Sequence, residues 1–566
     1  MRGLLTLAAV TALCAGAARG ADRPEGRTFA TRSVTLARHG MVAAAHPLAV
    51  QVGVDVLKRG GSAVDAAIAV NAALAFMEPV SCGLGGDLFA MVWDPKTNSL
   101  YGLNASGRAP AALTIERIPA EKDGTIPLHS PYAWTVPGCV DGWFALHARF
   151  GRLPMAELLR PTITYAREGV PVPQIIAGAW RRATRLFAAK PGFAEVFMPG
   201  GEAPGEGDLF TNPALARTLE TLARGGRDAF YRGSIATAIV AFSRAHGGFF
   251  SPEDFATHTS DWVQPISTTY RGWQVWELPP PGQGLAALQI LNILEHFDLK
   301  AMGRDSADFW HLLVEAKKLA YEDRARLYAD PRFAAVSVEQ LLGKEYARRQ
   351  SQRIDMTRAA RTIDPGNPHL DEGDTTFLAT ADPSGMLVAL IQSNYTGFGS
   401  GYVIPELGFG LHNRGAQFAL DPAHPNALAP GKRPFHTIIP AFLGRAGTPL
   451  MAFGVMGGDM QPQGHVQIVV NIVDFGMNLQ EAGDAPRFHH TGSSEPTGTI
   501  MSDGGVLHLE SGVSPEIRRE LLRRGHRIVE TTGTNFGGYQ GIWRDPRSGV
   551  LHGASESRKD GCAMGF

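Results

Sequence analysis

The sequence predicts an α+β fold in which antiparallel sheets lie inside and helices cover them. Two observations support this prediction. Helical periodicity occurs in both the first and the last third of the chain, and each of these regions also contains strand patterns joined by short turns. A hairpin has one apolar face that needs to be buried, so helices are expected to pack on it and to produce a layered fold.

The first third begins with two predicted helices. Apolar residues recur at helical spacing over Pro47–Lys58 and stop at Gly60 and Gly61. The alanine-rich segment Ala63–Met77 then resumes an apolar helix, so both helices are expected to face the core. The glycine cluster SCGLGGD follows, and the next segment, LFAMVWDPKTNSLYGLNAS, predicts two strands around a Pro-Lys-Thr-Asn turn.

Helices are predicted to dominate residues 155–350, and the last third is predicted to mix strands and helices. The clearest elements are a helix over Asp308–Tyr328, strands over Thr375–Ser393 with a turn at Pro383–Gly385, strands over Ile438–Val455, and a helix beginning at Val466. The proline-rich stretch Asp421–His436 is predicted to be an ordered surface loop.

Charge and composition narrow the possible functions. The 566 residues are 44% hydrophobic, which is ample for a large core, and 53 Lys and Arg face 54 Asp and Glu. This balance leaves no electrostatic signature for nucleic acid or for an anionic membrane surface. A small-molecule substrate is therefore expected.

Residues 1–20 have the pattern of a secretory signal peptide. One early cation precedes an apolar stretch from Leu4 to Cys14, and small residues offer a cleavage point between Ala17 and Ala21. The stretch is too short to span a bilayer, and Cys14 lacks a lipoprotein processing context. We expect a periplasmic or secreted protein without a membrane anchor.

Several familiar site patterns are absent or incomplete. The remaining cysteines, Cys82, Cys139 and Cys562, are too few for a disulfide framework and are expected to be free. The Gly282-x-Gly284 motif lacks a preceding strand and a ribose-binding acid, and the adjacent histidines at 489–490 point to opposite faces of an extended chain. No metal or organic cofactor is expected.

The dipeptide Asp374-Thr375 is the most distinctive chemical feature. A threonine hydroxyl is a weak nucleophile and needs a base to take its proton. If the bond before Thr375 were cut, the new α-amine, with a pKa of about 8, would accept the hydroxyl proton. One residue would then be both nucleophile and base, and the same hydroxyl would perform the cut by attacking the carbonyl of Asp374.

An ordered series of motifs resembles the γ-glutamyltransferase (γ-glutamyltranspeptidase) family over nearly all of the mature chain. The motifs are GMVAAAHPLAVQVGVDVLKRGGSAVDAAIAVNAAL, EPVSCGLGGDLF, DTTFLATAD, GFGSGYVIPELGFGLHN, GKRPFHTIIPAF, GVMGGDMQPQGHVQ and DAPRFHH. The resemblance implies a four-layer αββα sandwich, the N-terminal-nucleophile (Ntn) hydrolase fold, formed by two chains after self-cleavage.

The resemblance also implies the catalytic groups. It places the cut between Asp374 and Thr375, which gives a large subunit (21–374) and a small catalytic subunit (375–566) that form a heterodimer. It makes Thr375 the nucleophile and Ser393 the hydroxyl that hydrogen-bonds it. Gly457 and Gly458 fall on the pair whose N–H groups form the oxyanion hole, where glycine permits close backbone approach.

The substrate pocket departs from the family pattern. Where γ-glutamyl transpeptidases hold the α-carboxylate with arginine and the α-ammonium with aspartate, this chain has Ser106 and Gln417. A neutral amide cannot replace an ion pair to an ammonium, so recognition of glutathione should weaken by about 2 to 4 kcal/mol for each lost charged contact. The other changed positions expected to bind substrate are Tyr395, Arg414, His436 and Thr437.

These changes resemble the oxamate amidohydrolase and acylase-like branch of the family. An acyl group with a carboxylate but no amine is then plausible, and Arg108, Arg414 and His436 are the candidate carboxylate holders. Arg108 lies two residues beyond the usual arginine, on the same face if that strand continues.

The sequence therefore predicts a self-processing threonine amidohydrolase or acyltransferase that cleaves a small amide through an acyl-enzyme. Two alternatives stay open. One is a true γ-glutamyltransferase or glutathione hydrolase with an altered pocket, and the other is an uncleaved, non-catalytic exported binding protein.

Overall fold

The computed structural model describes residues 27–119, 121–122, 124–363, 373–529 and 536–566. The predicted signal peptide, residues 1–20, lies outside the described residues. Among the described helices, none has the length and apolar character needed to cross a membrane.

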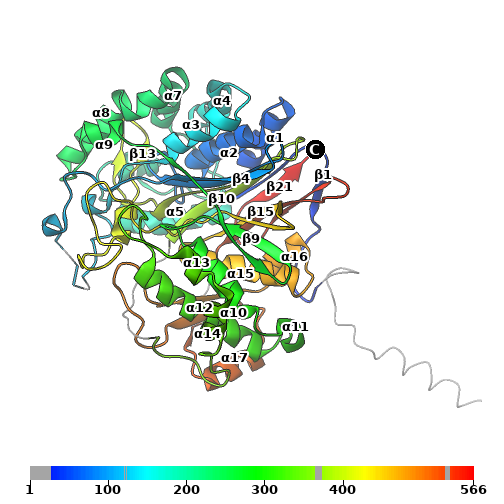
Figure 1. Ribbon diagram of the computed structural model, residues 1–566. Helices are drawn as coiled ribbons and strands as arrows, with labels where there is room; N and C mark the ends of the chain where they lie inside the picture. Colours follow the sequence, from blue (N-terminus) through cyan, green and yellow to red (C-terminus); the bar gives the residue numbers. More distant parts are fainter. Residues whose placement is uncertain (1–26, 120, 123, 364–372, 530–535) are drawn as a thin grey trace, which may run out of the picture.

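Two seven-stranded sheets form the centre of the molecule (Figure 1). The first sheet contains the strand that begins at the predicted cut, and the strand pairs given by their registers are antiparallel. Its strands, in spatial order, are β21 (Cys562–Gly565), β2 (Met41–Ala44), β10 (Gly373–Ala381), β11 (Leu387–Thr396), β3 (Asp87–Asp94), β4 (Ser99–Ala105) and β7 (Asp261–Val263).

The second sheet is also antiparallel and lies against the first. Its strands, in spatial order, are β1 (Thr35–Ala37), β20 (Leu551–Ser555), β19 (Gly538–Arg544), β15 (Thr448–Met456), β14 (Ala441–Arg445), β9 (Trp273–Glu277) and β8 (Ile266–Tyr270). The two sheets share a buried core to which β10 contributes Phe377 and β15 contributes Ala452.

Helices cover the outer face of each sheet and complete four layers (Figure 1). The layer on the first sheet contains α1 (Pro47–Lys58), α2 (Ala63–Met77), α3 (Cys139–Phe150), α4 (Met155–Glu168) and α7 (Pro213–Tyr231). The layer on the second sheet contains α10 (Gly284–Leu294), α12 (Ala307–Leu327) and α15 (Met460–Val473). The predicted four-layer αββα sandwich is confirmed.

Further helices and strands complete the described part of the fold. The other helices are α5 (Gln174–Phe187), α6 (Phe193–Phe197), α8 (Ser234–Ala245), α9 (Pro252–Ala256), α11 (Leu299–Met302), α13 (Val338–Leu341), α14 (Lys344–Ser351), α16 (Leu479–Asp484) and α17 (Pro515–Arg523). The other strands are β5 (Val170–Pro171), β6 (Leu209–Phe210), β12 (Val403–Ile404), β13 (Phe409–Gly410), β16 (Phe488–Thr491), β17 (Val506–Leu509) and β18 (Ile528–Val529).

The strongest sequence patterns gave correct elements. Helices α1 and α2 have the predicted bounds, and the predicted strand pairs appear as β3 with β4, β10 with β11, and β14 with β15. In α2 every residue is buried, as expected for a helix that is apolar on all sides. Cys82 and Cys139 are buried free thiols, and Cys562 is free and half-buried.

Helices dominate residues 155–350 as predicted, and three details of the sequence analysis needed revision. The predominantly helical stretch also contains β7, β8 and β9, of which β8 and β9 form a hairpin whose turn, Arg271-Gly272, has positive φ at both residues. Helix α15 begins at Met460 and not at Val466, because Pro462 lies in the first turn, where no N–H partner is needed. The loop 421–436 is ordered, but its end is buried, including His436.

Candidate active site

Thr375 lies at a β-bulge near the start of β10. The register of β10 on β11 passes from Asp374 opposite Tyr395 to Thr376 opposite Gln392, so two residues of β11 stand across from Thr375 alone. Bulges re-aim side chains and are common beside active sites. Here the Thr375 hydroxyl is buried, and its Oγ1 lies 3.1 Å from the Oγ of Ser393.

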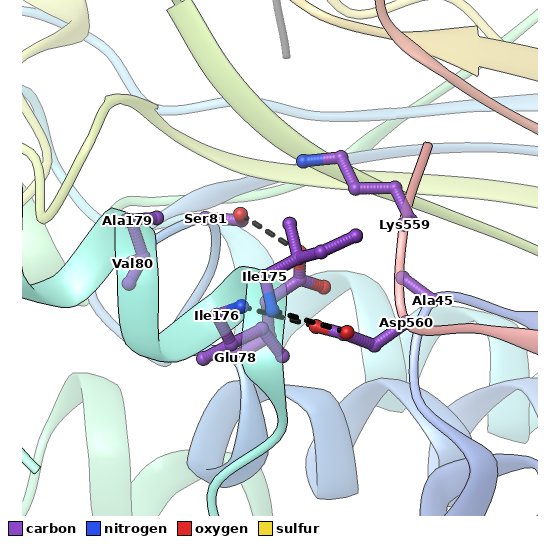
Figure 2. A pocket seen from close by; sticks show the side chains of 9 residues that line it. All are labelled: Ala45, Glu78, Val80, Ser81, Ile175, Ile176, Ala179, Lys559 and Asp560. Carbon is purple, nitrogen blue, oxygen red and sulfur yellow. Dashed lines mark hydrogen bonds between the residues drawn. The ribbon is translucent and has the colours of Figure 1, made fainter. Parts of the chain in front are cut away.

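The opposite face of β10 is held by a buried carboxylate. Thr376 Oγ1 donates to Glu78 Oε2 at 2.8 Å, and Ser81 Oγ donates to Glu78 Oε1 at 3.0 Å. Figure 2 shows Glu78 and Ser81 in the wall of a small cavity, with the side chain of Lys559 above them. The threonine pair is therefore divided between two faces, because adjacent strand residues point in opposite directions.

Gly457 and Gly458 connect β15 to α15 on the sheet that faces β10. Their φ angles are 119° and 58°, a region that favours glycine. A Cβ at Gly457 would also lie 3.1 Å from the Cα of Gly537. Among the described residues, none accepts a hydrogen bond from the N–H of Gly457 or of Gly458. Both donors lie at the N-terminal end of α15, where the helix dipole favours negative charge.

Three of the predicted substrate-binding side chains lie together. The guanidinium of Arg414 lies 4.6 Å from the centre of the Tyr395 ring, and Gln417 Nε2 donates to the Tyr395 hydroxyl. All three are buried. Tyr395 has φ 79°, unusual for a residue with a Cβ, and its N–H donates to Ser393 Oγ at 2.8 Å. Tyr395 therefore links the substrate-binding side chains to Ser393, whose hydroxyl contacts that of Thr375.

A buried carboxylate, Asp87, organises the remaining pocket residues. Arg414 Nε donates to Asp87 Oδ2 at 2.9 Å, and His436 Nε2 lies 3.1 Å from the same oxygen. Arg414 Nη1 also donates to Thr437 Oγ1 at 2.8 Å. Asp87 also stands directly opposite Ser393 in the pairing of β11 with β3. Burial alone would raise the pKa of Asp87, but Arg414 and His436 hold this pKa well below its usual range.

The same contacts define the charge of the pocket. Burial lowers the pKa of His436 although the charge of Asp87 opposes this shift, and the charge of Arg414 is balanced by Asp87. The pocket therefore offers a paired guanidinium, a tyrosine, a neutral amide and a hydroxyl.

Arg108 contacts a different set of residues. The strand that was expected to continue through it ends at Ala105, so the alternation argument does not apply. Its guanidinium pairs with Asp261 at 3.4 Å and donates to the carbonyl of Thr259. Ser106 is buried, and its hydroxyl donates to Asn104 Oδ1 at 2.6 Å. The contacts found for these two side chains do not include Thr375, Tyr395 or Arg414.

Sequence reasoning missed Asp87 and Gln283. Asp87 closes a glycine cluster and opens a strand that is buried throughout, and an acid in such a position needs a cationic partner. The sequence around Asp87 could therefore have indicated a buried ion pair. Gln283, which contacts the carbonyl oxygens of Thr437 and Gly458, had no comparable signal, because its partners are main-chain atoms far away in the sequence.

One histidine and carboxylate group outside this region has the composition of a metal site. Ligand atoms of His311, Glu315 and His526 lie within 4.8 Å of one another. These atoms already bind protein groups: Lys318 Nζ is 2.8 Å from Glu315 Oε1, and His311 Nδ1 is 2.8 Å from His526 Nε2. A positive ammonium next to the carboxylate opposes cation binding. His489 and His490 also have protein partners, Asp459 and Lys317.

The four-layer fold, with a buried threonine near the start of a central strand and a glycine turn on the facing sheet, defines the class of N-terminal-nucleophile hydrolases. The chain belongs to the γ-glutamyltranspeptidase family, because the model of that family matches residues 49–566.

Relatives in this family have several activities. The chain is 36% identical to the glutathione hydrolase-like YwrD proenzyme of Bacillus subtilis, over 93% of this chain and 98% of the relative. It is 37% identical to the oxamate amidohydrolase proenzyme of Klebsiella pneumoniae, over 94% of this chain and 100% of the relative. The crystal structure of cephalosporin acylase from Bacillus halodurans superposes with a TM-score of 0.87 at 42% identity, covering 96% of this chain and 99% of that chain.

Proposed function

We propose that this protein is a self-processing amidohydrolase, with acyltransfer as a secondary activity, and that Thr375 is its nucleophile. The observation that supports this most directly is the 3.1 Å contact between the Thr375 and Ser393 hydroxyls at the bulge of β10. Cutting the bond after Asp374 would free the amine of the residue that already holds a buried, oriented hydroxyl.

The reaction then proceeds in two steps. Thr375 Oγ1 attacks the amide carbonyl, its α-amine takes the hydroxyl proton and passes it to the leaving nitrogen, and an ester to Thr375 forms. The N–H groups of Gly457 and Gly458 stabilise the oxyanion, and such a donor is worth about 3 kcal/mol. Water, or an acceptor amine, then attacks the ester and releases the acyl group.

The substrate class follows from the pocket. Gln417 is neutral, and in the described part of the chain its Oε1 accepts no hydrogen bond, so it is available to a neutral donor on the acyl group. Among the described residues that contact Arg414, the carboxylate of Asp87 is already paired with that guanidinium, so it is not a fixed partner for an ammonium. We infer that the acyl group has no α-ammonium and that the guanidinium and Thr437 receive its polar or carboxylate end.

Processing and location complete the proposal. The relatives named above include proenzymes, and we propose that this chain likewise yields subunits 21–374 and 375–566, which remain together as a heterodimer. The segment 1–20 would direct export, so the mature protein would be periplasmic or secreted.

The nucleophile is tested with Thr375→Ala and Thr375→Ser. The alanine variant lacks the attacking oxygen, so it should remain one band on a denaturing gel and show no amidase activity. The serine variant should still give two bands and retain activity. Thr380→Ala is the matched control, because the Thr380 hydroxyl on the same strand donates to the carbonyl of Ala63, away from Thr375 and Ser393. Processing or turnover by Thr375→Ala would refute the assignment.

The substrate class is tested separately, by comparing hydrolysis of a γ-glutamyl anilide, oxamate and a glutaryl amide by the processed protein. We expect the ammonium-free substrates to have the higher kcat/KM. A preference for the γ-glutamyl compound would favour the true γ-glutamyltransferase, and an intact single band with no turnover would favour the binding protein.

A further inference from the structure

Gln283 is buried where two loops of the candidate active site meet. It precedes α10, and its side-chain amide is enclosed by protein. Nε2 donates to the carbonyl oxygen of Gly458 at 2.9 Å and to that of Thr437 at 2.7 Å. A single amide group therefore connects the glycine turn to the loop that supplies Thr437 to the acyl pocket.

The orientation of this amide is determined by a buried arginine. Arg324 Nη1 donates to Gln283 Oε1 at 2.7 Å, and Arg324 also forms an ion pair with Glu495. Because a guanidinium only donates, Oε1 has to face it and Nε2 has to face the two carbonyls. The guanidinium also lies 3.8 Å from the centre of the Tyr321 ring, so its own position is restricted.

A side chain of helix α12 binds the residue that follows the glycine turn, Asp459. The hydroxyl of Tyr321 donates to the carbonyl of Asp459. Two side chains, one before α10 and one on α12, thus bind consecutive carbonyl oxygens of the turn. The preceding carbonyl, that of Gly457, accepts the N–H of Met460 at 3.0 Å.

These contacts determine where the N–H of Gly458 points. A peptide unit is planar, so its N–H is opposite to its carbonyl. The peptide before Gly458 is held by Met460. The peptide after it is held by Gln283 and by the N–H of Gln461, which donates to the Gly458 carbonyl at 3.3 Å. With both planes held, the rotation of glycine, which is otherwise the least restricted residue, is removed.

We propose that Gln283 is a positioning residue for the oxyanion hole. It binds neither substrate nor nucleophile, and it acts by holding the Gly457–Gly458 turn against the Thr437 loop. This inference rests on the proposed function, which makes those N–H groups the donors to the tetrahedral intermediate. Because the donors must match the developing oxyanion and not the ground-state carbonyl, losing the clamp should affect kcat more than KM.

The test uses Gln283→Glu, which keeps the shape of the side chain and its contact with Arg324 but places an acceptor against two carbonyls. We expect kcat to fall by about 10-fold to 100-fold with little change in KM, because small misplacements of catalytic groups have effects of that order. Rates are normalised to the processed fraction on a denaturing gel. If Gln283→Glu is not processed, Gln283→Met replaces it; this variant loses the Nε2 donors and also the Oε1 that accepts from Arg324.

A matched control lies on the same helix. Gln289 is also buried, with Nε2 donating to Asp323 at 2.7 Å and Oε1 accepting from the Tyr328 hydroxyl. Gln289→Glu should destabilise the protein without lowering kcat. Equal losses of kcat in the two variants would indicate a general effect of destabilisation and overturn the proposal.

A second measurement separates positioning from packing. A boronic acid that forms a tetrahedral adduct with Thr375 should lose affinity in Gln283→Glu by about the factor by which kcat falls, whereas the affinity for the carboxylate product should stay the same. Unchanged boronate affinity in Gln283→Glu and Gln283→Met would overturn the proposal.

The inference and the proposed function fail in different ways. Gly458→Ala should lower kcat and boronate affinity if the glycine turn is the oxyanion hole. If Gly458→Ala has no effect, the oxyanion assignment in the proposed function is wrong. If Gly458→Ala has an effect and the Gln283 variants have none, only the positioning role is wrong.

Discussion

Asp87 shows how a single buried charge organises a pocket. Its carboxylate is enclosed by protein and contacts Arg414, His436 and, at 3.5 Å, His412. Removing one partner of a buried ion pair leaves an uncompensated charge, whereas removing both partners is much less costly. The stability of the pocket should therefore depend on the pair and not on either residue alone.

A double-mutant cycle measures this dependence. Asp87→Asn and Arg414→Met should each destabilise the protein by about 3 to 5 kcal/mol, and the double variant should lose less than the sum. Denaturant unfolding gives the free energies. The exposed pair of Glu345 and Arg348 is the control, and Glu345→Gln should produce no measurable change. Additive losses at Asp87 and Arg414 would contradict a coupled pair.

The pH dependence of the free energy of unfolding gives a second test of the role of the Asp87 charge. The pKa of Asp87 in the folded protein lies below the unfolded value of about 3.9, so ionised Asp87 stabilises the fold above that pH. This contribution is lost as pH falls below about 4. The difference in stability between the wild type and Asp87→Asn should therefore narrow as the solution is acidified from about pH 5 to about pH 3.

The roles of residues were predictable where a family motif contains the residue or lies close to it. Thr375 and the glycine pair lie in family motifs, Ser393 lies between two of them, and the structure places Thr375 and Ser393 in contact. Arg108 was placed by assuming that β4 continues, and the strand ends before it. The partners of Arg414 could not be predicted, because they depend on which loops meet after the two sheets pack.

At the scale of elements, hydrophobic periodicity correctly predicted the helices and strands that are buried on one face or on all faces. It failed for β7, β8 and β9, which lie at or next to sheet edges and contain polar residues such as Thr268 and Thr269. Edge strands need less apolar sequence because one side remains unpaired. The bulge at Thr375 was also beyond sequence reasoning, since it is a property of the register between β10 and β11.

One helix terminus is completed by a distant part of the chain. Asp560 accepts hydrogen bonds from the N–H groups of Ile175 and Ile176 at 3.1 and 3.0 Å, and these groups begin α5 (Figure 2). The preceding residue, Pro173, provides no side-chain cap. If the chain is cut before Thr375, this cap joins the small subunit to the large one.

Asp560→Ala should therefore lower the free energy of unfolding by about 1 kcal/mol, because the cap and its interaction with the helix dipole are lost. Denaturant unfolding of the processed protein is the measurement. Ser514→Ala, which removes the side-chain cap of α17, is the control and should lower the free energy of unfolding by a similar amount. A loss in Ser514→Ala with none in Asp560→Ala would contradict the cap on α5.

At the scale of the whole molecule, the proposed subunits are interleaved within both sheets. In the first sheet β10 and β11 of the small subunit lie between β2 and β3 of the large one, and in the second sheet β14 and β20 of the small subunit pair with β9 and β1 of the large one. Separating the subunits would expose the edges of these strands and the core between the sheets. Dissociation and unfolding should consequently be one process.

This coupling predicts a difference between the processed protein and the uncleaved Thr375→Ala variant. The processed form should elute as one species in native buffer although it gives bands of about 350 and 190 residues under denaturing conditions. Its unfolding midpoint should rise with protein concentration, because folding requires two chains to associate, whereas the midpoint of Thr375→Ala should not. If the subunits separated in native buffer and each kept the circular dichroism spectrum of a folded protein, each subunit would be stable alone. That result would contradict a fold in which both sheets are shared between the subunits.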